Sequence, residues 1–131
     1  MKDTHLGVVR MQVRAIRGAI TVPENTKDSI LEGTRELLDE IINRNNIIKD
    51  DIISIIFSMT NDLNAVFPAV AARELGLIDV PLMCSNEINV PGSLKSCIRI
   101  LLHLNTDKAN SEMNHVYLKN AVALRPDLAG K

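Results

Sequence analysis

Apolar and polar residues alternate near the beginning of the chain, from Val9 to Ile20, with the period of two that is typical of a β-strand. Arg17 falls on the apolar face, which makes it a candidate for an inward contact with an anion. An equally open alternative is that the strand ends at Gly18, or that a bulge turns Arg17 outward. The two faces are Val9, Met11, Val13, Ala15 and Ala19 on the apolar side, and Arg10, Gln12 and Arg14 on the side expected to meet solvent.

A repeat of apolar residues at steps of three and four follows, and it predicts an amphipathic helix that ends near Asn45 and Asn46. Asn25 or Thr26 is expected to cap its beginning, with Asp28 in the first turn. The charged outer face is expected to be solvated and is assigned no chemistry, while the apolar face should cover one side of a sheet. That apolar face consists of Ile30, Leu31, Thr34, Leu37, Leu38, Ile41 and Ile42.

The β-branched run over residues 52–58 is short enough for a buried strand. Pro68 then begins a short helix that should stop at Gly76. Phe67 lies just before this helix, where backbone N–H groups favour anions. The alternative, which spacing alone favours, is that Phe67 forms a hydrophobic staple with the helix.

The stretch from Pro81 to Arg99 contains a thiol, a carboxylate and a guanidinium, and we expect it to organise the site. A turn at Pro91 and Gly92 predicts that a strand ending near Cys84 returns as a second strand over about residues 95–105. This hairpin would set Cys84 beside Arg99, with Glu87 on the connecting loop.

Arg99 lies inside the apolar run 97–102. Because a guanidinium keeps its charge, burying it is costly unless an anion pairs with it. The sequence therefore indicates an acidic ligand. The alternative, favoured on this stretch alone, is an arginine that reaches solvent or forms a structural ion pair with Glu87.

The end of the chain predicts a short strand over residues 114–118, which contains Tyr117, and one or two helical turns over residues 121–124. Pro126 favours an extended Arg125, which either folds over a site or points into solvent. Residues 1–10 are expected to be an N-terminal extension, and residues 11–131 a single domain.

Composition narrows the classes of function. The 131 residues are 46% hydrophobic but 2% aromatic, which predicts one domain with an aliphatic core. The net charge is −1 and no basic block is present, which argues against a nucleic-acid partner. Cys84, Cys97 and the three scattered histidines suggest neither a zinc site nor a disulfide. With no signal-peptide pattern and no apolar stretch long enough to cross a bilayer, we expect a cytoplasmic protein without a membrane partner.

Six collinear motifs together resemble the monofunctional chorismate mutases of the Bacillus type, over about residues 13–128. The resemblance implies an α+β fold, a mixed β-sheet with packed helices that assembles into a trimeric pseudo-barrel with sites between subunits. It also implies an isomerase of aromatic amino-acid biosynthesis that rearranges chorismate to prephenate without cofactor or metal. The motifs are RAIRGAITV (14–22), DLNAVFPA (62–69), AREL (72–75), VPLMCSNE (80–87), GSLKSCIR (92–99) and HVYLKNAVALRPDL (115–128).

The resemblance also implies roles for individual residues. Arg99 would approach the ether oxygen, Glu87 with the Cys84 thiol nearby would hold the ring hydroxyl, and Tyr117 would add a donor. The remaining substrate-binding residues would be Arg17 and Arg125 at the carboxylates, Phe67, Ala69 and Arg73 from the adjacent subunit, Leu82 and Met83 beside Cys84, and Leu124 closing the pocket.

Two positions depart from the family pattern. Val70 stands where the family commonly has a lysine at the mouth of the site, and Met83 replaces a small polar residue. The loss of the lysine is expected to weaken the attraction of a dianion.

Overall fold

A computed structural model describes residues 11–125 of the protein. The expected N-terminal extension, the Val9 start of the first strand, Arg10 and Pro126 lie outside the described residues. The described part contains a five-stranded mixed sheet of order β3-β2-β4-β1-β5. The strands are β1 (Gln12–Thr21), β2 (Ile52–Met59), β3 (Leu82–Asn86), β4 (Cys97–Thr106) and β5 (Val116–Leu118). β4 pairs antiparallel with β1 and β2, whereas β5 runs parallel to β1 and β3 parallel to β2.

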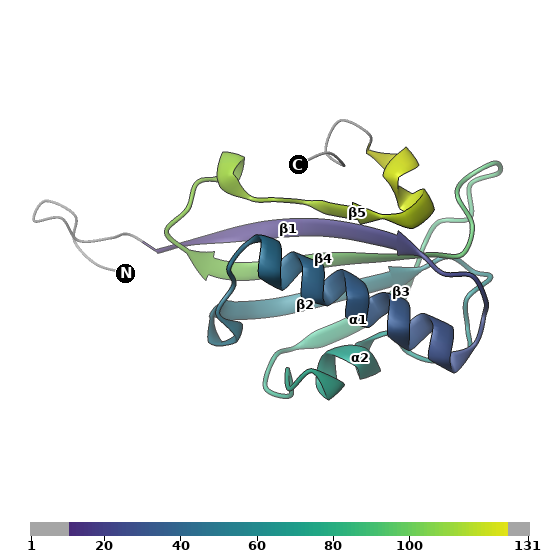
Figure 1. Cartoon of the computed structure of the whole chain (residues 1–131), viewed down its shortest axis with the longest axis horizontal. Coiled ribbons are helices and arrows are strands. Elements are labelled where there is room, and N and C mark those ends of the chain that lie inside the picture. The colour runs from purple at the N-terminus through teal and green to yellow at the C-terminus, as the bar shows by residue number, and fades with distance from the viewer. Residues whose placement is uncertain (1–10, 126–131) are drawn as a thin grey trace, which may run out of the picture.

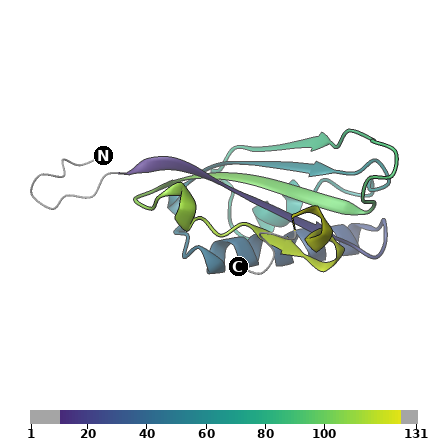
Figure 2. The same cartoon turned by 90° about the horizontal axis from the view of Figure 1, so that it is seen from above.

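Two α-helices, α1 (Lys27–Arg44) and α2 (Ala69–Glu74), cover the same face of this sheet, as Figures 1 and 2 show from two directions. Three short 3-10 helices complete the described chain: η1 (Lys49–Asp51), η2 (Asn110–Glu112) and η3 (Lys119–Leu124). We call the face against α1 and α2 the helix face, and the other the open face. Part of the open face is covered by η3 and by the loop before β4. Ala121 and Leu124 of η3, and Leu94 of that loop, pack against Ala19 and Tyr117.

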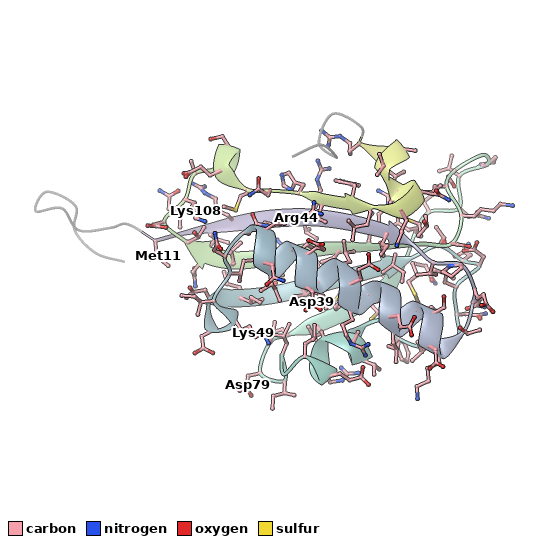
Figure 3. All side chains as sticks on the ribbon, viewed as in Figure 1. Met11, Asp39, Arg44, Lys49, Asp79 and Lys108 are labelled. Atoms are coloured by element: carbon pink, nitrogen blue, oxygen red, sulfur yellow. The ribbon has the colours of Figure 1, made fainter. Side chains whose placement is uncertain are left out.

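The core lies between the helix face and α1, and it is aliphatic except for Phe57 of β2. Charged residues such as Asp39 occupy the outer side of α1, as expected for a solvated surface (Figure 3). Gly18 of β1 allows the close approach of the helix, because a Cβ at this position would lie 2.8 Å from Ile41 Cδ1. Fully buried members of the core include Ile16, Ile20, Ile30, Leu37, Leu38, Ile41, Ile55, Ile98 and Leu102.

The ends of α1 follow from its sequence. Thr26 caps the beginning, since its side-chain oxygen accepts the Ser29 N–H at 3.1 Å. At the other end Asn45 is buried, and its side-chain amide donates to the carbonyls of Ile41 and Asn114, both at 2.9 Å. Asn45 Oδ1 also accepts the Asn114 N–H at 2.8 Å. This amide therefore ties the end of α1 to the segment that leads into β5.

Most predicted elements are confirmed. The helix that follows Thr26, the strand after Asp51 and the short helix after Pro68 lie where the pattern predicted them. Gly76 ends α2 with a φ of +91°, in the left-handed region that favours glycine. The predicted strand around Tyr117 is present, and the helical turns near the end are η3.

The prediction for the two faces of β1 is wrong. Ile16, Gly18 and Ile20, which share the face of Arg14, pack toward α1, whereas Val13 on the other face is 58% exposed. The alternation was misleading because β1 carries apolar residues on both faces. The strand continues to Thr21 and pairs with β4 without a break in register, which excludes the alternatives that it ends at Gly18 or that a bulge turns Arg17.

The predicted hairpin between β3 and β4 is also wrong, because β2 lies between these two strands. The chain from β2 returns through α2 to form β3, and such a crossover produces a parallel pair. Residues 87–96 then pass the end of β2 before β4 begins. Cys84 is therefore paired with Phe57, and Arg99 with Ser58 on the other edge of β2.

Candidate active site

One row of residues crosses all five strands on the open face. Residues in register on neighbouring strands point to the same side of a sheet, so their side chains form a continuous line. From β3 to β5 this row is Ser85, Ser58, Arg99, Ala19 and Tyr117. The alanine in the middle leaves room between the guanidinium and the phenol.

Arg99 is not buried among the isoleucines that flank it in sequence. Ile98 and Ile100 point to the helix face and are buried, whereas the side chain of Arg99 points to the open face and is 45% exposed. Because the Arg99 guanidinium is partly exposed, the chain does not pay the free-energy cost of burying an unpaired charge.

Glu87 lies directly beside Arg99, and their ion pair joins Glu87 Oε1 to Arg99 Nε at 2.8 Å. The Ser58 hydroxyl donates to the other carboxylate oxygen, Oε2, at 2.5 Å. The Glu87 backbone N–H donates to the Met59 carbonyl at 2.9 Å and continues the strand pairing past the end of β3. The carboxylate is thus held at both of its oxygens, while the backbone of Glu87 is fixed by a third bond. The ion pair foreseen as an alternative from the sequence is present.

These side chains line a cavity of about 240 Å³. Arg17 lines the same cavity from β1, and its backbone N–H donates to His115 Nδ1 at 3.0 Å. Two guanidinium groups and one carboxylate therefore face a common space, which favours an anionic ligand. The lining residues are Arg17, Gly18, Ile56, Ser58, Ser85, Glu87, Arg99, Ile100, Leu101 and Tyr117.

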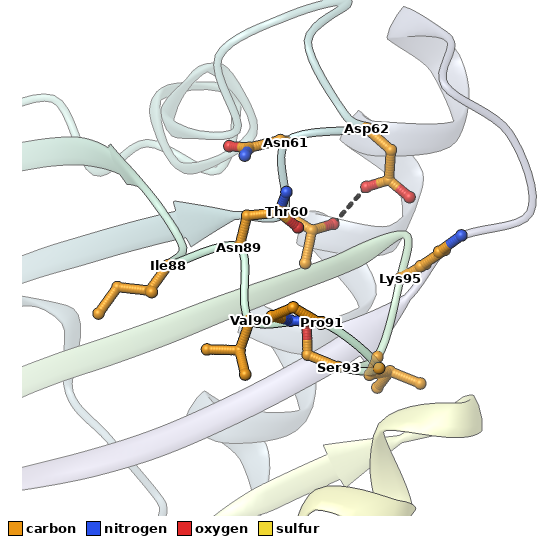
Figure 4. A pocket seen from close by; sticks show the side chains of 11 residues that line it. Thr60, Asn61, Asp62, Ile88, Asn89, Val90, Pro91, Ser93 and Lys95 are labelled. Atoms are coloured by element: carbon orange, nitrogen blue, oxygen red, sulfur yellow. Dashed lines mark hydrogen bonds between the residues drawn. The ribbon is translucent and has the colours of Figure 1, made fainter.

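A larger cavity of about 410 Å³ lies where the loop over residues 88–95 faces Thr60, Asn61 and Asp62 (Figure 4). Its carboxylate is already satisfied, since Asp62 accepts from the Thr60 hydroxyl at 2.5 Å and from the Ser96 N–H at 2.9 Å. The Thr60 hydroxyl contributes most to lowering the pKa of Asp62. Burial opposes it, and the Ser96 N–H and hydroxyl add smaller lowering contributions. The cavity contains one cation, Lys95. We therefore take the Arg99 cavity as the candidate site.

Comparison with known proteins shows the family of the chain. Residues 13–128 match the family described as chorismate mutase type I. The chain belongs to this family. It is 46% identical to chorismate mutase AroH of Bacillus subtilis strain 168 over 120 residues, which cover 91% of this chain and 94% of that protein. It is 49% identical to chorismate mutase AroH of Thermus thermophilus over 117 residues, covering 88% and 96%.

A solved structure supports the same assignment for the fold. The chorismate mutase from Clostridium thermocellum superposes with a TM-score of 0.82 at 54% sequence identity, covering 83% of this chain and 97% of that chain. The α+β fold predicted from the sequence, a mixed sheet with packed helices, is therefore that of a type I chorismate mutase.

The residues expected at the mouth of a chorismate mutase site form a second group. Phe67 is 69% exposed just before α2, so it does not form the predicted staple. Arg73 is exposed on α2, while Ala69 is buried at its first turn. Met83 of β3 is 65% exposed on the open face. Phe67, Ala69, Arg73, Leu82, Met83 and Cys84 do not line the Arg99 cavity of this chain.

The expected position of Cys84 beside Arg99 is wrong for a single chain. Cys84 and Leu82 are in register with Phe57 and Ile55, and both pack against the core on the helix face. The Cys84 thiol is therefore separated from Arg99 by the thickness of the sheet. The other thiol, Cys97, is buried on the open face, and burial raises its pKa to about 11.

The last expected residues lie near the Tyr117 end of the row. Leu124 packs against the cluster of Ala19, Cys97, Tyr117 and Ala121, so it lies beside the cavity. Arg125, the last described residue, has an extended φ of −145°. Within the described chain, no three His, Cys, Asp or Glu side chains gather where they could hold a metal ion. Residues 11–125 also contain no helix that is long and apolar enough to cross a membrane.

Ser58 and Ser85 line the cavity but were not predicted from the sequence. A signal was present, because Ser54 and Ser58 interrupt an otherwise apolar run at positions of equal parity. In a strand this spacing marks one face. That face is the one on which Ser58 meets Glu87.

Proposed function

We propose that the protein rearranges chorismate to prephenate in its Arg99 cavity, as an isomerase of aromatic amino-acid biosynthesis. The observation that supports this most directly is the pairing of Arg99 with Glu87 in a cavity that Arg17 also lines, in a chain that belongs to the type I chorismate mutase family. Chorismate is a small dicarboxylate, so two guanidinium groups suit it. Its ring hydroxyl suits the single carboxylate.

The reaction exchanges one bond for another within one molecule and needs no nucleophile from the protein. The enzyme has two tasks. It restrains the substrate side chain in a reactive geometry, and it places donors where the breaking C–O bond leaves negative charge. In our proposal Arg99 serves the ether oxygen and Glu87 accepts from the ring hydroxyl.

Arg17 and Arg125 would bind substrate carboxylate, and Tyr117 would add a donor. Leu124 would close the pocket beside Arg125. Tyr117 is buried at the edge of the cavity, and this supports a donor shielded from water.

We further propose a homotrimer in which each site is completed by a neighbouring subunit. Phe67, Ala69 and Arg73 would come from that neighbour and line the mouth of the site. Exposed apolar residues support such an interface: Val13, Ile56 and Met83 on the open face, and Phe67 beside α2. A domain over residues 11–131, an appendage over residues 1–10 and a cytoplasmic location complete the proposal.

The proposal is tested by following chorismate consumption through its ultraviolet absorbance with purified protein. Conversion that requires no added metal or cofactor is the expected result. Protein that binds chorismate without consuming it would be a carboxylate-binding module instead, and the proposed function would be rejected. Mass measurement in solution tests the assembly, since a fully active monomer is incompatible with shared sites.

A further inference from the structure

Ser58 is the residue of the cross-strand row that lies between Ser85 and Arg99. We propose that Ser58 is a positioning residue, whose hydroxyl fixes the orientation of the Glu87 carboxylate for substrate. This inference rests on the proposed function, because it assigns a part of the same site. Ser58 acts on the substrate indirectly, through Glu87.

The two oxygens of the Glu87 carboxylate have different donors. Ser58 Oγ donates to Oε2 at 2.5 Å, and Arg99 Nε holds Oε1 at 2.8 Å. The two donors come from paired positions on β2 and β4, so their spacing is set by the sheet. With the Glu87 backbone also bound to Met59, the carboxylate plane is fixed from two directions.

Removal of the Ser58 hydroxyl would leave Glu87 held by Arg99 alone. A glutamate side chain has three torsions, and a single charge-assisted contact to a 45%-exposed guanidinium does not fix all of them. The carboxylate could then follow Arg99 instead of remaining beside β2. Ser58 thus keeps Glu87 in place when Arg99 turns toward a substrate oxygen.

The chemistry of the hydroxyl adds a second consequence. Since the Ser58 proton is donated to Glu87, Ser58 presents acceptor lone pairs to the cavity. Each oxygen of Glu87 also retains acceptor capacity after its one bond. This side of the cavity therefore accepts hydrogen bonds and suits a hydroxyl group of the ligand, while Arg17, Arg99 and Tyr117 form the donating side.

Ser54 provides a matched control. It lies on the same face of β2 as Ser58, four residues earlier, but it does not line the Arg99 cavity. Its hydroxyl lies 3.3 Å from His103 Nδ1. A serine-to-alanine change at either position removes one hydroxyl from the same face of β2, and the two changes differ in whether Glu87 loses a donor.

The experiment is a double-mutant cycle on chorismate turnover. Ser58→Ala is expected to lower kcat about tenfold or more, the cost of a hydrogen bond to a charged group, while Ser54→Ala changes it less than about twofold. Ser58→Thr, which keeps the hydroxyl, is expected to retain most of the activity. In a Glu87→Ala background the Ser58→Ala change should cost less than about twofold, because the carboxylate that Ser58 donates to is absent.

The outcomes are distinct. An inactive wild type rejects the proposed function, and the inference falls with it. An active wild type with equal losses from Ser58→Ala in both backgrounds overturns the inference alone, since the role of Ser58 would then be independent of Glu87. If Glu87→Ala is too slow to measure, a crystal structure of Ser58→Ala decides: an unmoved Glu87 carboxylate overturns the inference, and a displaced one supports it.

Discussion

Arg17 and Arg99 are diagonal neighbours on the antiparallel pair of β1 and β4, and both line the same cavity. Ala19 lies opposite Arg99, two residues beyond Arg17 on the same face. Among the residues that line this cavity, Glu87 contributes the one carboxylate. Two positive charges against one negative charge leave the space with an excess of positive charge, which is compatible with a dianion.

Removing Arg99 should therefore affect turnover far more than removing an arginine on the other face. We expect Arg99→Ala to lower kcat/KM by about 100- to 1000-fold, the usual cost of losing one well-placed donor. Arg14 points to the helix face and donates to the Lys108 carbonyl at 3.0 Å, so Arg14→Ala should leave kcat/KM nearly unchanged. Steady-state kinetics of the two variants checks this, and equal losses would reject the assignment of the faces.

The mouth of the site offers a test of electrostatic attraction. Val70 lies half-buried on α2, where the resemblance implies a lysine in related enzymes. We expect Val70→Lys to lower KM severalfold at low salt, and the gain should fade as salt screens the added charge. Kinetics at two ionic strengths measures the effect. A KM that is unchanged at low salt contradicts the prediction.

Packing between β1 and α1 should be intolerant of one added methyl group. A Cβ at Gly18 would lie 2.8 Å from Ile41 Cδ1 and 3.1 Å from both Leu37 Cδ1 and the Val116 carbonyl oxygen. We expect Gly18→Ala to cost about 1–3 kcal/mol in the free energy of unfolding, as overpacked cores do. Denaturant unfolding measures this. Adding Ile41→Val should recover part of the loss, and no recovery would place the strain elsewhere.

Asp62 should make stability depend on pH in acid. Its pKa in the folded protein is lower than the ordinary value for an aspartate, mainly because the Thr60 hydroxyl donates to it. A lowered folded-state pKa stabilises the protein above the unfolded value, and this contribution is lost as pH falls through the folded value. Asp62→Asn should therefore have a lower unfolding temperature than wild type at pH 7, and the difference should shrink below about pH 4. A difference that is constant with pH would exclude this origin.

The Cys97 thiol should be unreactive in the native protein. Burial raises the pKa of Cys97 to about 11, so little thiolate is present at pH 8 and access is closed. We expect Cys97 to remain unmodified by iodoacetamide in the native protein and to react after unfolding. Peptide mass spectrometry locates the label. Rapid native modification of Cys97 would contradict its burial.

Local patterns were sufficient to predict the helices and most strand positions, because caps, periodicity and turn residues act within a few residues. Thr26, Pro68 and Gly76 begin or end elements as their chemistry predicts. The pairing of strands could not be obtained in this way. Whether Cys84 lies beside Arg99 or across β2 from it depends on contacts between segments far apart in the chain.

The residues of the candidate site could be predicted from the sequence in part. Arg17, Glu87, Arg99 and Tyr117 line one cavity, and each had been singled out from the sequence and the family resemblance. The spacing of Ser54 and Ser58 marked one face of the strand, but the role of Ser58 could not be predicted because its partner, Glu87, lies 29 residues away in the chain. The choice of face failed for β1 because Ile16 and Ile20 lie among the positions expected to be polar.

The row from Ser85 to Tyr117 takes one residue from each of the five strands, and this has a consequence for folding and for tolerance to insertions. A shift of any strand by a single residue would exchange its two faces. In β4 such a shift would expose Ile98 and Ile100 to water and bury Arg99 in the apolar core. The same event would dismantle the core and the chemistry together. A chain with a shifted strand would therefore be unstable as well as inactive, so a stable but inactive fold with the wrong register is not expected.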